Sequence, residues 1–302
     1  RDKGRIKEAI SSYKSVLSIN PNFVQAYTSL GALHRQQGKI EKAIENYKKA
    51  LKINPSYPEA HFLLGNAQLE VLNYNEAIDS YRDAIDLKKD YPEAWSNLGD
   101  IYAERNYIDE ALSAYENAID LDPESIDILC SLGSARRQNG ELDLAIEAFK
   151  KAIKLDPERA ETYSNYGIVL NDNGQKKEAM ECHHFAIARK PDSASLYLNY
   201  GVTLDQNGEL NKATEIYKKA LNLKPGYIQA HANLAFLYLF KGNLKLGLEH
   251  RKWRWKSKEG QQKISHLKLP EWDGEKSLKD KRILALGEQG PGDVIMWAPG
   301  LE

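Results

Sequence analysis

Residues 282–297 of this chain, R-I-L-A-L-G-E-Q-G-P-G-D-V-I-M-W, combine a short apolar run with a glycine-rich turn. Residues 282–286 predict a buried strand, and Asp293 is typical of a residue that caps the start of a helix. Backbone N–H groups at such a helix start favour an anion, so we expect Gly290 and Gly292 to form an anion- or acceptor-binding loop. The glycine spacing matches neither a P-loop nor a dinucleotide fingerprint, so the segment alone does not specify a ligand.

A second chemical candidate is the run Cys182, His183 and His184. Adjacent helical side chains point in different directions, and no further ligands follow at zinc spacing, so we expect no metal site. His183 instead occupies a position that holds an aromatic residue elsewhere in the chain, which predicts a packed, hydrogen-bonded histidine. Cys130 has no evident partner base, so we do not expect a catalytic thiol.

Composition excludes several broad classes of function. The 302 residues carry a net charge of −1, which argues against a dedicated nucleic-acid binder because such proteins need a basic face. Two cysteines are too few for a disulfide framework, so we expect a reducing, cytoplasmic location. No apolar run is long enough to span a membrane. The chain begins inside an amphipathic pattern, and we expect its true N-terminus to lie upstream.

Most of the chain repeats with a period of 34 residues. A glycine recurs at this spacing: Gly31, Gly65, Gly99, Gly133, Gly167 and Gly201. Two alanine columns keep the same register, and one further column is aromatic: Tyr47, Tyr81, Tyr115, Phe149 and Tyr217, with His183 as the substitute. Small residues let two helix backbones approach closely, while the aromatic side chains fill the space between them. The pattern predicts paired helices whose core forms only when neighbouring units stack.

The columns resemble the tetratricopeptide repeat, and one unit carries the whole signature: Trp95, Leu98, Gly99, Tyr102, Ala111, Tyr115, Ala118 and Pro123. We therefore expect an all-α superhelical solenoid over residues 1–258, followed by the truncated beginning of an α/β Rossmann-like domain. The array divides into a partial repeat (1–23), six full repeats (24–227) and a divergent seventh (228–258). A linker (259–281) and the truncated domain (282–302) follow.

One polar column lies on the first helix of each repeat, facing the expected inner groove. We call it the asparagine ladder: Asn97, Asn165, Asn199 and Asn233, with Ser29 and Ser131 in the same column and Leu63 as the exception. An amide both donates and accepts, so the ladder could clamp the backbone of an extended polypeptide. The repeats of O-linked N-acetylglucosamine transferases are similar, and that resemblance implies polypeptide binding. The alternative is that these amides are solvated or bond to the neighbouring repeat.

The second helix of the seventh repeat carries Trp253 and Trp255 among basic residues. Because a terminal repeat is usually polar outside, the two tryptophans suggest that another module docks there. Together with residues 282–302, this end resembles bacterial repeat proteins that continue into a glycosyltransferase of the GT-B, heptosyltransferase-like type. The resemblance implies a C-terminal domain packed on both tryptophans, a nucleotide sugar for the parent protein, and Asp293 as a base toward the acceptor hydroxyl.

The fragment itself is expected to bind no cofactor and to catalyse nothing, because the donor half of such an enzyme would need about 150 further residues. The main hypothesis is an acceptor-presenting scaffold of a nucleotide-sugar-dependent glycosyltransferase. The competing hypothesis is a pure protein–protein interaction scaffold for assembly, secretion or signalling.

Overall fold

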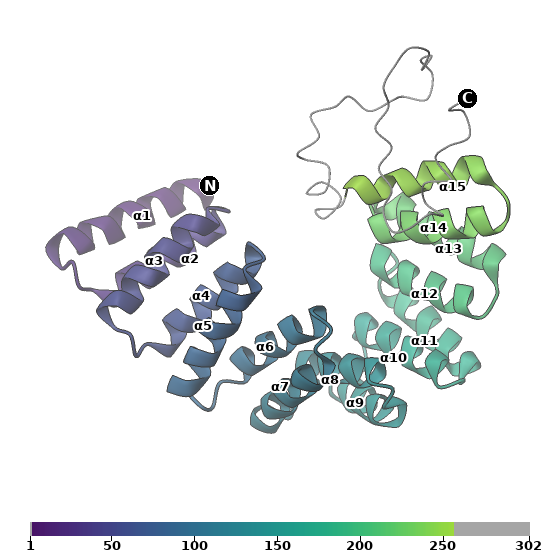
Figure 1. The fold of residues 1–302 in the computed structure, drawn as a ribbon, viewed down its shortest axis with the longest axis horizontal. Helices are drawn as coiled ribbons and strands as arrows, with labels where there is room; N and C mark the ends of the chain where they lie inside the picture. Colours follow the sequence, from purple (N-terminus) through teal and green to yellow (C-terminus); the bar gives the residue numbers. More distant parts are fainter. Residues whose placement is uncertain (1, 257–302) are drawn as a thin grey trace, which may run out of the picture. The chain divides into compact units, whose positions relative to one another are not determined.

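The computed structural model describes residues 2–256, and the described part is helical throughout (Figure 1). Its helices are α1 (Asp2–Ile19), α2 (Val24–Gln36), α3 (Ile40–Ile53), α4 (Pro58–Glu70), α5 (Tyr74–Leu87), α6 (Pro92–Glu104), α7 (Ile108–Leu121), α8 (Ile126–Gln138), α9 (Leu142–Leu155), α10 (Ala160–Asp172), α11 (Lys176–Arg189), α12 (Ala194–Gln206), α13 (Leu210–Leu223), α14 (Ile228–Phe240), α15 (Leu244–Arg251) and the 3₁₀ helix η1 (Lys252–Lys256). The α-helices lie in the first of two compact units, Arg1–Trp253; the second, Arg254–Glu302, is described only over residues 254–256.

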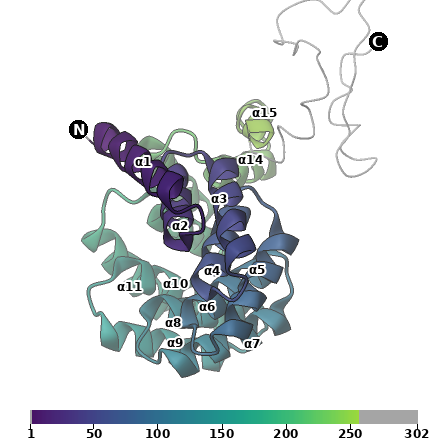
Figure 2. The ribbon, with the colours of Figure 1, turned by 90° about the vertical axis from the view of Figure 1, so that its left-hand side faces the viewer.

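From α2 onward the helices form successive antiparallel pairs, each with its most extensive contacts inside the pair. The even-numbered helix is the first of each pair and the odd-numbered helix the second, and α1 packs alongside α2 (Figures 1 and 2). The predicted all-α solenoid of helix pairs is therefore confirmed over the described residues. The expected Rossmann-like beginning, residues 282–302, lies outside them.

The turn inside each pair is made by one residue in the left-handed region. Five of these turn residues are glycines, with φ between 72° and 80°, and Asn106 follows with φ 63°. Leu72 occupies the same column with φ 62°, a conformation that costs a leucine about 1–2 kcal/mol. Leu72 keeps the left-handed conformation because only such a residue reverses the chain within a turn short enough for the second helix to pack on the first.

The glycine column within the first helices marks a close approach between the two helices of a pair. A Cβ atom placed on Gly99 would lie 2.7 Å from the Tyr115 ring, well inside van der Waals contact. The seventh repeat carries Ala235 in this column, and there the aromatic position holds Arg251. Glycine is therefore required where a ring lies beneath it, and the two columns depend on each other.

Each second helix packs on the first helix of the next repeat, as α7 does on α8. First helices of neighbouring repeats also contact each other, as α8 does with α10, whereas neighbouring second helices make no comparable contacts with each other within the described residues. The carboxyl ends of the first helices carry a recurring side-chain pair between repeats. Its members are Arg35 with Glu70, Arg137 with Asp172 at 2.7 Å, and Asn171 with Gln206 at 2.9 Å. The first helices thus line the narrower, inner side, as the sequence predicts.

Candidate functional site: the first-helix face

The structure places one residue of the asparagine ladder on each first helix except α4. Ser29 lies on α2, Asn97 on α6, Ser131 on α8, Asn165 on α10, Asn199 on α12 and Asn233 on α14, and all six are half-buried. On α4 the column holds Leu63, which packs on a buried cluster containing Leu64 and Tyr47. The ladder is thus continuous from α6 to α14 and interrupted before it.

Two ladder amides already have partners in the preceding repeat. Asn97 Nδ2 donates to Asn66 Oδ1 at 2.8 Å, and the Tyr81 hydroxyl donates to the same oxygen at 2.7 Å. Asn199 Nδ2 donates to Ser164 Oγ at 3.0 Å. At these two positions the amide contributes to the joint between repeats, which is the alternative role that the sequence leaves open.

Asn165 differs, because its amide forms no hydrogen bond with any other described residue. It borders a hollow of about 170 Å³ that we call the ladder hollow, whose walls come from α6, α7, α8 and α10. The lining residues are Ala103, Tyr115, Cys130, Ser131, Ser134, Ala135, Gln138 and Asn165. The hollow therefore offers an amide, hydroxyl groups and a glutamine side chain at a single place on the first-helix face.

The charged, phenolic and thiol groups beside this hollow are partnered by neighbouring protein groups. The Tyr115 hydroxyl donates to Asp100 Oδ1 at 2.7 Å, and the Ser131 hydroxyl lies beside the same carboxylate. Burial, and then the Asp100 charge, raise the pKa of Tyr115, while burial raises the pKa of Asp100. Burial also raises the pKa of the Cys130 thiol, whose sulfur lies 3.6 Å from Thr162 Oγ1. These shifts keep the phenol and thiol protonated, which suits hydrogen bonding better than nucleophilic chemistry.

Comparison with known proteins gives the family. A family model described as "Cilia and flagella-associated protein 70 C-terminal domain", a tetratricopeptide-repeat model, matches residues 55–252. The TPR repeat model matches residues 1–38 and 31–71. The chain belongs to this tetratricopeptide-repeat family. No curated protein matches it.

Two solved structures share the fold, the first of them described as a tetratricopeptide repeat protein. A protein from Parabacteroides merdae is 20% identical with a TM-score of 0.63, covering 82% of this chain and 94% of its own. Pseudomonas aeruginosa pilF is 22% identical with a TM-score of 0.56, covering 68% of this chain and 94% of its own. YrrB, described as a TPR protein with an unusual peptide-binding site, is 24% identical with a TM-score of 0.47, covering 62% of this chain and 96% of its own.

At the end of the tetratricopeptide array, Trp253 packs on its own repeat. Its ring stacks on His231 with centroids 4.1 Å apart and planes 6° apart. His231 Nε2 donates to the Pro225 carbonyl oxygen at 2.8 Å, and His231 Nδ1 lies 2.8 Å from His250 Nδ1. Trp253 therefore completes the seventh repeat. In the second unit, the Arg254 guanidinium lies 4.9 Å from the Trp255 ring centroid.

The Cys182–His184 run behaves as a structural element of the fifth repeat. His183 is 1% exposed, its Nε2 lies 2.8 Å from Thr203 Oγ1, and its Nδ1 is buried without a partner. Burial, and then the neighbouring His184, lower the pKa of His183 to about 4. Burial raises the pKa of Cys182 to about 11. Within the described residues no cluster of three or more His, Cys, Asp or Glu side chains is arranged to hold a metal ion.

Three predicted site residues, Gly290, Gly292 and Asp293, lie outside the described residues. Among residues 2–256, no helix is long and apolar enough to cross a membrane. Sequence reasoning missed Ser134 and Gln138 as partners of the ladder. They follow Ser131 at helical spacing on α8, so their place on the same face was predictable. That they enclose a hollow with Asn165 depends on how two repeats stack.

Proposed function

We propose that this tetratricopeptide array is a scaffold that binds an extended polypeptide on its first-helix face. The observation that carries the proposal is the unpaired Asn165 amide beside the ladder hollow. An amide that is half-buried and has no protein partner is available to an incoming ligand at no cost to existing hydrogen bonds. The neighbouring amides of Asn97 and Asn199 each retain a free carbonyl oxygen for a ligand N–H group.

The chemistry of the face favours a peptide backbone over a charged small molecule. Asn165 can donate to a peptide carbonyl and accept from a peptide N–H, and repeated first helices present such groups in series. Two arginines at the ends of the first helices are already paired between repeats, Arg35 with Glu70 and Arg137 with Asp172 at 2.7 Å. Recognition would therefore depend on the backbone and on small side chains that fit a hollow of about 170 Å³.

The test compares Asn165→Ala with Asn97→Ala. Binding of short, unstructured peptides of mixed sequence is followed by fluorescence anisotropy, and stability by thermal melting. We expect Asn165→Ala to weaken binding about three- to tenfold with an unchanged melting temperature, because it removes one hydrogen bond made only to the ligand. Asn97→Ala is expected mainly to lower the melting temperature, since its amide joins two repeats. Unchanged affinity in a combined Asn165, Asn199 and Asn233 alanine variant would contradict the proposal.

A finer proposal is that the bound polypeptide is an acceptor for a nucleotide-sugar-dependent glycosyltransferase. It is supported by the resemblance of residues 282–302 to the start of a GT-B domain, with Asp293 as the base and Gly290 and Gly292 in the acceptor loop. A nucleotide sugar would then be the cosubstrate of the parent protein, and the described array would supply only the acceptor.

That proposal is tested on the gene product read beyond residue 302. Nucleotide-sugar donors are supplied with a peptide that binds the ladder, and transfer is measured by mass spectrometry. Transfer that Asp293→Asn abolishes, without loss of peptide binding, would support it. Peptide binding with no transfer from any donor would favour the pure interaction scaffold instead.

A further inference from the structure

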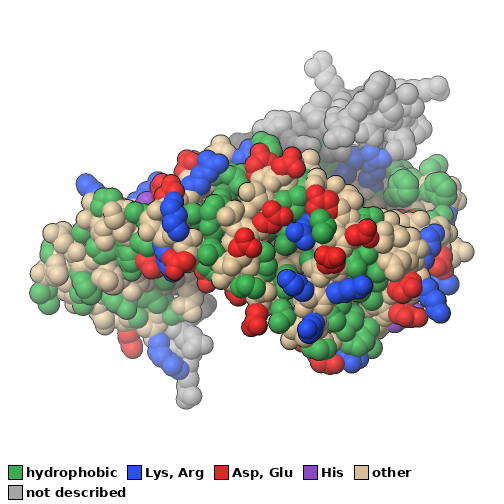
Figure 3. All heavy atoms as spheres, turned by 90° about the horizontal axis from the view of Figure 1, so that it is seen from below, with side chains coloured by type: hydrophobic (Ala, Val, Ile, Leu, Met, Phe, Trp, Pro, Cys, Tyr) green, Lys and Arg blue, Asp and Glu red, His purple; other side chains and the backbone are tan. Residues whose placement is uncertain are grey.

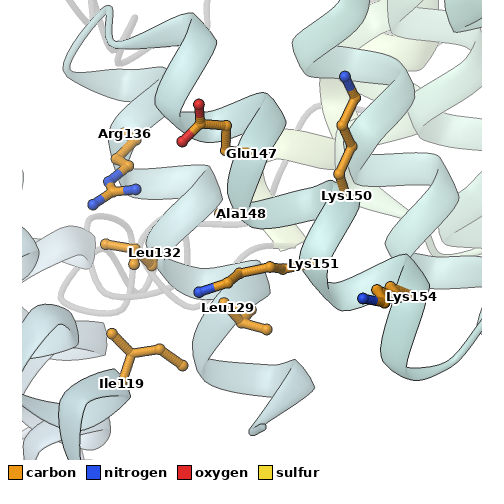
Figure 4. Close-up of a pocket in the computed structure, with 9 residues that line it drawn as sticks. All are labelled: Ile119, Leu129, Leu132, Arg136, Glu147, Ala148, Lys150, Lys151 and Lys154. Carbon is orange, nitrogen blue, oxygen red and sulfur yellow. The ribbon is translucent and has the colours of Figure 1, made fainter. Parts of the chain in front are cut away.

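The second-helix side of the same region carries a different hollow, formed by α7, α8 and α9 (Figure 4). We call it the basic hollow; its volume is about 460 Å³. The lining residues are Ile119, Leu129, Leu132, Arg136, Glu147, Ala148, Lys150, Lys151 and Lys154. On α8, the residues that line it recur at helical spacing opposite to those that line the ladder hollow, so α8 separates the two hollows.

The cations of the basic hollow are not neutralised by the protein. Lys150, Lys151 and Lys154 are exposed, and none of them forms an ion pair with a described residue. In Figure 4, Lys151 extends from α9 toward Leu129 and Leu132 on α8. Four lining side chains are thus cationic and one is anionic, which leaves an excess of positive charge around a recess.

The Arg136 guanidinium has weaker hydrogen bonds to the protein than the Arg137 guanidinium has. Its Nη2 reaches Glu116 Oε1 only at 3.4 Å, and its Nε is buried with no acceptor. By contrast, Arg137 on the opposite side of α8 contacts Asp172 at 2.7 Å. Buried donors without partners are rare in proteins, and one at the edge of a recess indicates room for an incoming acceptor. Carboxylates and phosphates are the groups that a guanidinium binds in strong, often bidentate, pairs.

Beneath these charges the hollow is apolar. Leu129, Leu132 and Ile119 line it, and Leu129 and Leu132 are 2% and 3% exposed. In Figure 4 the Lys151 side chain extends toward these leucines, and lysine stems commonly cover apolar surface. Because Lys151 forms no ion pair with a described residue, an apolar side chain of a ligand could take its place beside Leu129 and Leu132.

We propose that the basic hollow is a second binding site, for an acidic protein segment that also carries apolar side chains. Carboxylates of the segment pair with Lys150, Lys151, Lys154 and the under-satisfied Arg136, and an apolar side chain packs over Leu129 and Leu132. The site lies on the opposite side of α8 from the ladder, so it is independent of the polypeptide-binding proposal.

The surroundings favour a protein segment over a polyphosphate or nucleic acid. Glu147 lines the hollow and Glu116 lies next to Arg136, so a continuous row of phosphates would meet like charge. On the face shown in Figure 3, Lys and Arg side chains lie among Asp and Glu, with hydrophobic side chains between them. Nucleic-acid sites instead need an extended basic surface.

The three lysines of α9 have no counterpart in the preceding repeat. At the three columns occupied by the lysines of α9, the preceding second helix α7 has Glu116, Asn117 and Asp120. On α3, three repeats earlier, the same columns again hold exposed lysines: Lys48, Lys49 and Lys52. This recurrence provides a control with the same residue types at the same columns, away from the basic hollow; in it Lys49 pairs with Glu45 at 2.6 Å, so the melting temperature of the control is compared as well.

The experiment measures anisotropy of a labelled peptide in which Glu-Asp pairs alternate with single leucines. One variant replaces Lys150, Lys151 and Lys154 by Glu, a milder one replaces them by Gln, and the control replaces Lys48, Lys49 and Lys52 by Glu. All six lysines are exposed, so we expect every variant to fold, and thermal melting checks this. Further probes are the peptide with Gln and Asn for its acids, the peptide with Ser for Leu, an oligothymidylate and inorganic phosphate.

We expect the Glu variant of α9 to weaken binding at least about tenfold and the Gln variant less, whereas the α3 control stays within about twofold. The Gln/Asn and Ser peptides should both bind more weakly than the acidic peptide, and Asn165→Ala should have no effect. Equal losses in the α9 and α3 variants would show nonspecific attraction and overturn the proposal. So would oligothymidylate or phosphate binding that depends on the α9 lysines and displaces the peptide.

Discussion

At the scale of single residues, the aromatic column shows how one side chain depends on another. The Tyr81 hydroxyl donates to Asn66 and the Tyr115 hydroxyl donates to Asp100, both at 2.7 Å. Each acceptor is the residue that follows the column glycine on the first helix. In the first and sixth full repeats that position holds Ala32 and Val202. The hydroxyls of Tyr47 and Tyr217 are accordingly buried without hydrogen-bond partners.

This difference predicts opposite effects of the same substitution. Tyr81→Phe should lower the free energy of unfolding by about 1 kcal/mol, because it removes a hydrogen bond and leaves Asn66 without its phenol donor. Tyr217→Phe should leave stability unchanged or raise it by up to about 1 kcal/mol, since it removes a buried, unpaired hydroxyl. Urea unfolding measures both. A loss in Tyr217→Phe as large as that in Tyr81→Phe would show that the Tyr217 hydroxyl is paired, for instance with the nearby Asn233 amide.

At the scale of helix pairs, the distance between first and second helices is set by the ring beneath the column glycine. A Cβ on Gly99 would lie 2.7 and 2.8 Å from two atoms of the Tyr115 ring. A Cβ on Gly167 would meet the Ala179 carbonyl oxygen and His183 Nε2, both at 3.1 Å. The smaller histidine ring thus relaxes the requirement for glycine in the fifth repeat.

Gly99→Ala and Gly167→Ala are therefore matched variants. Gly99→Ala should lower the free energy of unfolding by about 2 kcal/mol, because overpacking exceeds the gain in helix propensity. Gly167→Ala should lower the free energy of unfolding by less than about 1 kcal/mol, because the cost of the tighter contact and the gain in helix propensity nearly cancel. Chemical denaturation of the two proteins gives the comparison directly. Similar losses would mean that the ring does not determine the spacing of the helices.

The helix pairs also show how far sequence predicts structure. The turn after each first helix holds Gly or Asn in six of the seven positions, because left-handed backbone is easy for those residues. This preference did not predict Leu72, which adopts φ 62° in a place where propensity argues against it. There the packing of α5 on α4 outweighs the local cost of the turn. The ladder hollow was missed for a similar reason: its walls come from α6, α7, α8 and α10, and sequence spacing does not give the separation between helices.

At the scale of the whole array, each repeat packs mainly on its immediate neighbours, so stability is approximately a sum of repeat and interface contributions. In the fifth repeat the aromatic column holds His183, whose Nδ1 is buried and unpaired. Its charged form is disfavoured by burial, and its pKa is lowered to about 4 from an ordinary 6.5. Lowering the pH should therefore destabilise the array, beginning at the fifth repeat.

The sign follows from proton uptake by the unfolded chain. Between pH 6.5 and 4 the unfolded state binds a proton at His183 that the folded state does not, so stability falls as pH falls through this range and is constant above it. The contribution is on the order of 3 kcal/mol at most. His183→Phe, which matches Phe149 one repeat earlier, should remove this part of the pH dependence. The free energy of unfolding of the original protein and of His183→Phe is measured against pH. Parallel curves for the two would contradict this explanation.

The sequence by itself determined the repeat, the helix pairs and the identity of every column, because periodic small, aromatic and turn residues are consistent with only one stacked arrangement. It also determined that the ladder would share one face. Only the tertiary structure decided which amides are free, since Asn97 and Asn199 find partners across the joint between repeats and Asn165 does not. Likewise, only the packing of α7 and α9 on α8 turns three exposed lysines into the wall of a hollow. The column to which a residue belongs follows from its spacing along the chain. Whether its side chain is free to bind a ligand depends on which groups of the neighbouring repeat contact it.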